Sequence, residues 1–118
     1  MIFIKANMKN KMISRLLQSI CLAGLIFGTS GVYAISEGET LASKNGCLAC
    51  HTIDKKLVGP SYKEVATKYK GVAGADATLI AKVKAGGVGT WGKIPMPANS
   101  PKVSDADIKT IVVWILGN

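Results

Sequence analysis

The segment that most constrains this chain is Cys47-Leu48-Ala49-Cys50-His51, a Cys-x-x-Cys pair followed directly by a histidine. The chain has 118 residues, which fits one small domain. A domain of this size has little apolar interior, so it commonly needs a disulfide, a metal ion or a cofactor for stability. Cysteine and histidine can supply such links, and the fold is therefore expected to form around this segment.

Residues 1–34 are expected to be a secretory signal peptide and not part of that domain. A basic head precedes an apolar stretch from Leu16 to Gly28, and small residues follow up to Ala34. That order is typical of a cleaved leader, although the same stretch could remain as a membrane anchor. The basic residues are Lys5, Lys9, Lys11 and Arg15. Cleavage after Ala34 would leave residues 35–118 in the periplasm, with no stable membrane insertion.

Removal of this leader lowers the net charge of the protein, and the net charge indicates which partners it can bind. The formal net charge falls from +8 to +4, and no arginine remains in residues 35–118. Basic runs interleaved with aromatic residues are also missing there, so nucleic acid is not expected as a partner. The remaining lysines can favour association with acidic proteins. We expect a monomer, because no large apolar patch is evident outside the helical stripes.

Four helices and no strand are expected in the remaining domain, so the predicted fold class is all-α. Three serines have capping-box spacing to an acidic residue, and a helix should follow each of them. The last helix also has a wide apolar stripe that must be buried. The expected helices run from Ser36 to about Asn45, from Ser61 to Gly71, from an Asp76 cap to Gly86, and from Ser104 through Ile108, Ile111, Val112, Ile115 and Leu116.

The Cys-x-x-Cys-His segment is compatible with several chemistries. A tetrahedral zinc site needs four ligands, and residues 35–118 offer only Cys47, Cys50 and His51 in such a cluster. A thioredoxin-like redox pair belongs to a βαβ unit, which the pattern does not indicate. A plain disulfide would close a very short loop and add little stability. Covalent haem attachment fits export and the single histidine better than these alternatives.

Met96 is the candidate for a second axial ligand to haem iron. It is the only methionine after the leader, and Pro95 and Pro97 flank it in a glycine-rich connection of the kind that usually has a function. Proline fixes its own φ and keeps the preceding residue extended, which makes a stiff loop that can hold a sulfur atom in place. The alternative is a methionine that only fills the core.

The segments GCLACH, VGPSY and GTWGKIPMPAN, together with the closing helix through Trp114, resemble the small class I bacterial cytochromes c, particularly the cytochrome c-551 group. The resemblance covers residues 35–118. It implies a small class I cytochrome c fold, with about four short helices around one covalently bound haem. Cys47 and Cys50 would be the thioether attachment sites, and His51 and Met96 would be the axial ligands of the iron.

The same resemblance implies a set of residues around the haem. The carbonyl of Pro60 would accept a hydrogen bond from the axial histidine, and the indole N–H of Trp91 would reach a haem propionate. Asn99 would donate to the methionine sulfur. Lys82 stands where the family has an arginine beside the propionates, and lysine lacks the bidentate fork of arginine. Trp114 is interpreted as a core aromatic.

With both axial positions filled by protein, the expected function is one-electron transfer and not catalysis. The resemblance implies that electrons come from a quinol-oxidising complex and go to a terminal oxidase, a nitrite reductase or a peroxidase. Some of the lysines near the haem-bearing segments are expected to surround the exposed haem edge and guide docking; the candidates are Lys44, Lys55, Lys56 and Lys93. A membrane-tethered haem subunit of a redox complex, and a haem enzyme or sensor with a labile sixth ligand, are the alternative functions.

Overall fold

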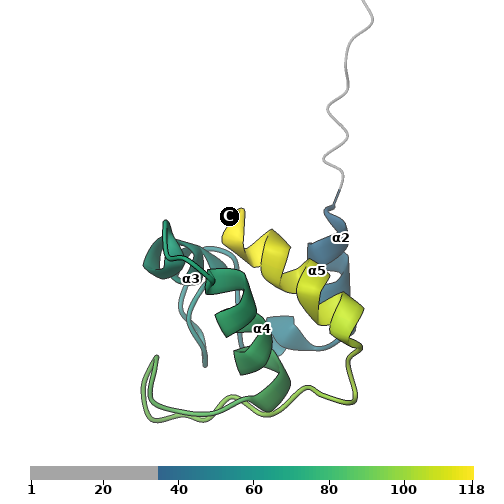
Figure 1. Cartoon of the computed structure of the whole chain (residues 1–118). Helices are drawn as coiled ribbons and strands as arrows, with labels where there is room; N and C mark the ends of the chain where they lie inside the picture. The colour runs from purple at the N-terminus through teal and green to yellow at the C-terminus, as the bar shows by residue number, and fades with distance from the viewer. Residues whose placement is uncertain (1–34) are drawn as a thin grey trace, which may run out of the picture. The chain divides into compact units, whose positions relative to one another are not determined.

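This computed structural model describes residues 35–118, so the predicted signal peptide lies outside the described residues. The described part contains four α-helices, one short 3-10 helix and no strand (Figure 1). The elements are α2 (Glu37–Lys44), η1 (Cys47–Ala49), α3 (Tyr62–Tyr69), α4 (Ala75–Ala85) and α5 (Asp105–Leu116). The all-α prediction is confirmed, and η1 is an element that the sequence patterns did not predict. None of the described helices has the length and apolarity needed to cross a bilayer.

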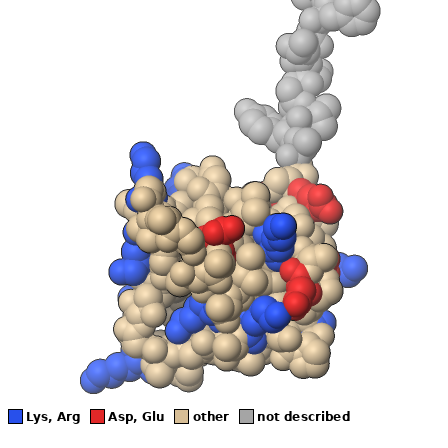
Figure 2. Space-filling view, in the orientation of Figure 1, with Lys and Arg blue, Asp and Glu red and all other residues tan. Residues whose placement is uncertain are grey.

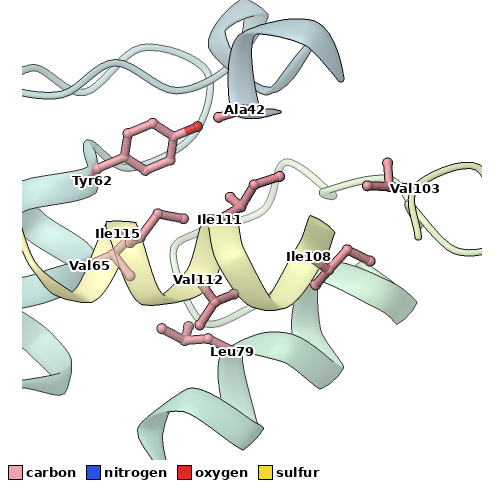
Figure 3. Packing of buried hydrophobic residues seen from close by; sticks show 9 residues of the cluster. All are labelled: Ala42, Tyr62, Val65, Leu79, Val103, Ile108, Ile111, Val112 and Ile115. Carbon is pink, nitrogen blue, oxygen red and sulfur yellow. The ribbon is translucent and has the colours of Figure 1, made fainter. Parts of the chain in front are cut away.

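Helix α5 is the centre of the hydrophobic core. It packs against α2, α3 and α4 (Figure 1). Ile108 and Val112 are fully buried, and α3 and α4 supply Val65 and Leu79 to the same cluster (Figure 3). The apolar stripe predicted for the last helix is therefore confirmed, apart from Leu116, which is only partly buried. Because burial of apolar surface is the main stabilising term in folding, this helix organises the domain.

Helices α2 and α5 approach closely at one glycine. A Cβ added to Gly38 would lie 2.1 Å from Cβ of Trp114, so no side chain fits at this position. Trp114 packs against the core cluster, as its interpretation as a core aromatic predicted. The edge of its ring meets Tyr62 of α3, with the ring centroids 4.9 Å apart. The contact between α2 and α5 thus continues into α3.

Serine side chains cap three of the helices. The hydroxyls of Ser36, Ser61 and Ser104 each accept a hydrogen bond from the backbone N–H three residues later. Only α3 has the complete capping box, because the backbone N–H of Ser61 also donates to Oε2 of Glu64 at 2.7 Å. These caps fix where the helices begin, since they satisfy donors that have no partner within the helix.

The start of α4 differs from the prediction. Its N-cap is Gly74, which has a φ of 72° and makes no side-chain capping bond, and the helix begins at Ala75. The prediction that Asp76 caps this helix is wrong, because Asp76 already lies in the first turn. Glycine adopts this left-handed conformation without steric cost, so the chain can enter the helix before it reaches the aspartate. A carboxylate in the first turn still interacts favourably with the helix dipole.

Candidate haem site

One cavity brings together the four residues that the sequence singled out as haem ligands. It has a volume of about 280 Å³, and Cys47, Cys50, His51 and Met96 all line it. Apolar side chains form most of the remaining wall, including Ile111, Val112 and Ile115 from α5. The cavity therefore lies against the central helix, between the segment that follows η1 and the connection from α4 to α5.

The two cysteines reach this cavity through the turn that η1 makes. Gly46 precedes η1 with a φ of 77°, and the backbone N–H of His51 donates to the carbonyl of Cys47 at 3.0 Å. Both thiols are half-buried and free. Burial raises the pKa of the Cys47 thiol above its ordinary value, which keeps it protonated at neutral pH. Redox-active cysteine pairs instead have a lowered thiol pKa, so this environment does not favour disulfide exchange.

The imidazole of His51 is held in one orientation and one tautomer. Its Nδ1 lies 2.8 Å from the carbonyl oxygen of Pro60. A carbonyl oxygen only accepts, so in the neutral imidazole Nδ1 holds the proton and Nε2 has the free lone pair. Gly59 lies close against the same ring, because a Cβ there would be 2.4 Å from Cε1 of the imidazole. A neutral imidazole with a fixed donor on one side is the form that binds a metal ion.

Backbone hydrogen bonds hold Met96 in place. Gly87 and Met96 exchange two of them, each 2.9 Å long, in an isolated antiparallel bridge. The prolines on either side have no N–H, so Met96 supplies the only backbone donor of the three residues. A Cβ at Gly86 would lie 2.4 Å from the carbonyl oxygen of Met96, which shows how closely the two segments approach. The backbone of Met96 is therefore held beside the end of α4, which puts this residue in the wall of the cavity.

Asn99 ties the same loop to α4. Its side-chain amide donates to the carbonyls of Val83 at 3.1 Å and Pro97 at 3.2 Å. Its backbone N–H lies 3.2 Å from the carbonyls of Val83 and Lys84. Donation from Asn99 to the methionine sulfur is not among the described contacts and stays a prediction.

Two more of the predicted residues line the cavity, Lys82 and Trp91. Lys82 lies on α4 and is half-buried, with its Nζ near Gly87. Trp91 lies in the connection after α4, and Nζ of Lys68 is 5.3 Å from the centre of its ring. The structure places both residues where they can face a bound group. Their contacts with haem propionates stay predictions.

Tyr62 is a residue of the cavity for which the sequence patterns indicated no role in the site. Its ring stacks on His51 with the centroids 5.4 Å apart. Only 2% of the residue is exposed, and its hydroxyl has no hydrogen-bond partner within residues 35–118. No sequence signal joined these two residues, because the contact depends on how the chain turns between them. The spacing of VGPSY fixes only that this tyrosine begins a helix.

The donor set and the walls of the cavity fit haem. Two free thiols, one imidazole with an available Nε2 and one thioether converge on a mostly apolar space. Soft sulfur and neutral imidazole are the axial ligands that haem iron takes in cytochromes c. An apolar wall suits the porphyrin faces, and the cysteines lie next to the histidine in the same turn.

Comparison with known proteins gives the family. The family described as Cytochrome c matches residues 35–118. Cytochrome c-551 of Azotobacter vinelandii is 58% identical over 79 residues, which cover 67% of this chain and 94% of that protein. Cytochrome c-551 of Allochromatium vinosum is 57% identical over 77 residues, which cover 65% of this chain and 81% of that protein.

A solved structure is similar in fold as well as in sequence. The crystal structure of wild-type Nitrosomonas europaea cytochrome c552 is 49% identical, with a TM-score of 0.64. The match covers 66% of this chain and 95% of that chain. Both the sequence relatives and this structure are cytochromes, in agreement with the donor set of the cavity. The chain therefore belongs to the cytochrome c family, as a small class I electron-transfer protein with covalently bound haem.

Proposed function

We propose that this protein is a periplasmic one-electron carrier whose haem iron is held by His51 and Met96, with thioether links to Cys47 and Cys50. The observation that supports it is the convergence of these four side chains on one largely apolar cavity. The free Nε2 of the histidine follows from the bond that its Nδ1 makes to Pro60. The bound haem supplies a one-electron couple between Fe(II) and Fe(III).

Rigid holding of both axial ligands suits electron transfer and not catalysis. The imidazole is fixed by Pro60 and Gly59, and the backbone of Met96 is fixed by its bridge with Gly87. With haem bound, His51 and Met96 would hold the iron from both sides and leave no position open for a substrate. Little of the chain must move when the charge of the site changes, because these contacts fix the histidine ring and the backbone that positions the methionine.

The rim of the cavity supports docking to other redox proteins. Four rim residues are large, apolar and exposed, at 46–66% of their surface: Leu57, Val58, Val88 and Ile94. Lys56, Lys82 and Lys93 line the same cavity, whereas Lys44 and Lys55 do not. Exposed apolar surface of this kind marks an interaction site, and lysines spread over the visible face add attraction at long range (Figure 2).

The rim is part of the proposed docking surface, and it refines the expectation that lysines guide docking. Two of the four lysines proposed to guide docking line the cavity, and the apolar rim was not foreseen. Electrons would come from a quinol-oxidising complex and pass to a terminal oxidase, a nitrite reductase or a peroxidase. A rim of apolar residues with few charges favours short-lived complexes that form and separate quickly, as a shuttle between partners needs.

Substitution of the methionine tests the proposed ligation. Met96→Ala should leave the haem covalently attached, lower the reduction potential and allow the reduced protein to bind carbon monoxide. Ile94→Ala is the matched control, because it shortens an exposed apolar residue of the same loop. We expect the control to keep the potential and to resist carbon monoxide. Unchanged potential and carbon monoxide resistance in Met96→Ala would show that another group is the sixth ligand.

The proposed location has its own test. If the leader is removed after Ala34, the intact mass of the purified protein equals that of residues 35–118 plus one haem. A mass that includes residues 1–34 would favour a tethered form instead. This measurement is independent of the ligand test, because cleavage does not alter the cavity residues.

A further inference from the structure

Trp91 forms a wall between the haem cavity and a second, open groove. Its side chain lines the cavity, and it also lines a groove beside α3 that contains Lys68 and Glu64. Lys68 lines the groove and not the cavity. The indole therefore has the proposed haem on one side and a cation on the other.

The backbone around Trp91 does little to fix this ring. The residue lies in a tight turn closed by a 3.0 Å hydrogen bond from the N–H of Gly89 to the carbonyl of Gly92. Both glycines have positive φ values, 105° and 127°, and a Cβ at either would meet nothing within 4 Å. The turn is thus open on its outer side. Contacts made by the indole itself must set its orientation.

Lys68 supplies such a contact from a well-anchored element. Its Nζ lies 5.3 Å from the centroid of the Trp91 ring. An ammonium group within about 6 Å of an indole centroid is attracted by the negative face of the ring. Helix α3 is fixed by its capping box and by the buried side chains of Val65 and Ala66. The lysine therefore connects a loosely held turn to a firmly packed helix.

We propose that Lys68 is a positioning residue for Trp91, holding the indole as one wall of the haem cavity through a cation–π contact across the groove. The inference rests on the proposed function only in taking the cavity to be the haem site. An indole held in one orientation presents its N–H to a bound acidic group in one direction. Without the cation, the ring would sample more orientations around its open turn.

The test is hydrogen exchange at the indole N–H groups of the reduced, haem-containing protein, followed by nuclear magnetic resonance. In Lys68→Met, which removes the charge but keeps the chain length, exchange at Trp91 should become about two- to fivefold faster. Lys68→Arg should restore the slow rate, because arginine also stacks on indole. Lys70→Met removes the same charge from an exposed residue just after α3 and should change nothing.

Trp114 is an internal control, since the chain has only two tryptophans. Its exchange should stay the same in every variant, whereas a general loosening of the fold would speed both indoles. In the unaltered protein, the ε-methylene protons of Lys68 should be shifted upfield by the ring current of Trp91. Unchanged exchange in Lys68→Met, equal acceleration at Trp114, or an unshifted Lys68 signal would each overturn the proposal. The ligand test with Met96→Ala would be unaffected by any of these results.

Discussion

The carbonyl oxygen of Pro60 lies 2.8 Å from Nδ1 of His51 and so decides which nitrogen of that histidine is free. A backbone carbonyl cannot donate, and the proton must therefore be on Nδ1. The two residues are nine positions apart along the chain, and the segment between them includes Gly59, which lies close to the same ring. Orientation and protonation of the proposed proximal ligand thus come from one short loop.

Gly59→Ala should disturb this arrangement. The new Cβ would lie 2.4 Å from Cε1 of His51, so either the ring or the loop must move. Overpacking of this kind costs about 1–3 kcal/mol of the free energy of unfolding. We expect that loss in guanidinium titrations, together with faster exchange of the Nδ1 proton. Gly117→Ala is the control, because its Cβ would make only ordinary contacts from 3.5 Å. Equal stability of the two variants would contradict the prediction.

Gly86→Ala should loosen the loop that contains Met96. Alanine at a φ of +69° is strained, and its Cβ would also lie 2.4 Å from the Met96 carbonyl oxygen. Gly71→Ala separates the two effects, because Gly71 has a φ of +72° and open space around it. The positive φ alone should cost each variant about 1–3 kcal/mol, although Gly86, with a ψ of −152°, lies outside the left-handed helical region. Only Gly86→Ala should also weaken the absorption band that the bond between haem iron and the Met96 sulfur gives in the oxidised protein. An unchanged band would show that the close approach of Gly86 does not hold Met96 in place.

The local parts of this structure could be predicted from sequence. Apolar spacing placed the buried face of α5, and serine caps placed the starts of α2, α3 and α5, because both signals act within one turn of helix. The start of α4 was missed, since a glycine in a left-handed conformation leaves no side-chain signal. The Cys-x-x-Cys-His segment indicated haem because its spacing is local as well.

Contacts between segments that are far apart in the chain could not be predicted from the sequence in the same way. Tyr62 stacks on His51, and Asn99 bonds to the end of α4, only because of how the loops turn back. Such turns depend on the whole packing of the chain. The resemblance to a family supplied the Pro60 contact, but it gave no indication of Lys68 beside Trp91.

Gly38→Ala reverses the usual effect of alanine in a helix. Alanine normally stabilises a helix interior by about 1 kcal/mol relative to glycine. Here its Cβ would lie 2.1 Å from Cβ of Trp114, so α2 and α5 would have to separate. We expect a loss of about 1–3 kcal/mol in the free energy of unfolding. Thr40→Ala, at an exposed position of α2, should have little effect. A stabilised Gly38→Ala variant would mean that the two helices are not in this close contact.

The capping box of α3 should make stability depend on pH in the acid range. Hydrogen bonds from the backbone and side chain of Ser61, with attraction from Lys56, lower the pKa of Glu64. A carboxyl group whose pKa is lower in the folded state adds stability above its unfolded pKa, and this stability is lost as pH falls through the folded value. Glu64→Gln can still accept the bond but cannot ionise. Its free energy of unfolding should fall less between about pH 5 and pH 3 than that of the unaltered protein. Parallel pH profiles would show that the carboxylate adds nothing as a charge.

Tyr62→Phe should leave stability unchanged or raise it slightly. The buried hydroxyl has no hydrogen-bond partner in the part of the chain that the structure describes, and burial raises the pKa of the phenol well above its ordinary value, so it stays neutral. An unsatisfied buried polar group costs about 1–3 kcal/mol, and phenylalanine removes that cost while it keeps the stacked ring.

Tyr62→Ala separates the ring from the hydroxyl. It should lose about 3–5 kcal/mol of the free energy of unfolding, because the ring fills the space between His51 and Trp114. If Tyr62→Phe instead destabilised the haem-containing protein by 1 kcal/mol or more, the hydroxyl would have a partner there. Comparing the two variants by guanidinium titration therefore tells whether this tyrosine contributes through its ring alone or also through its oxygen.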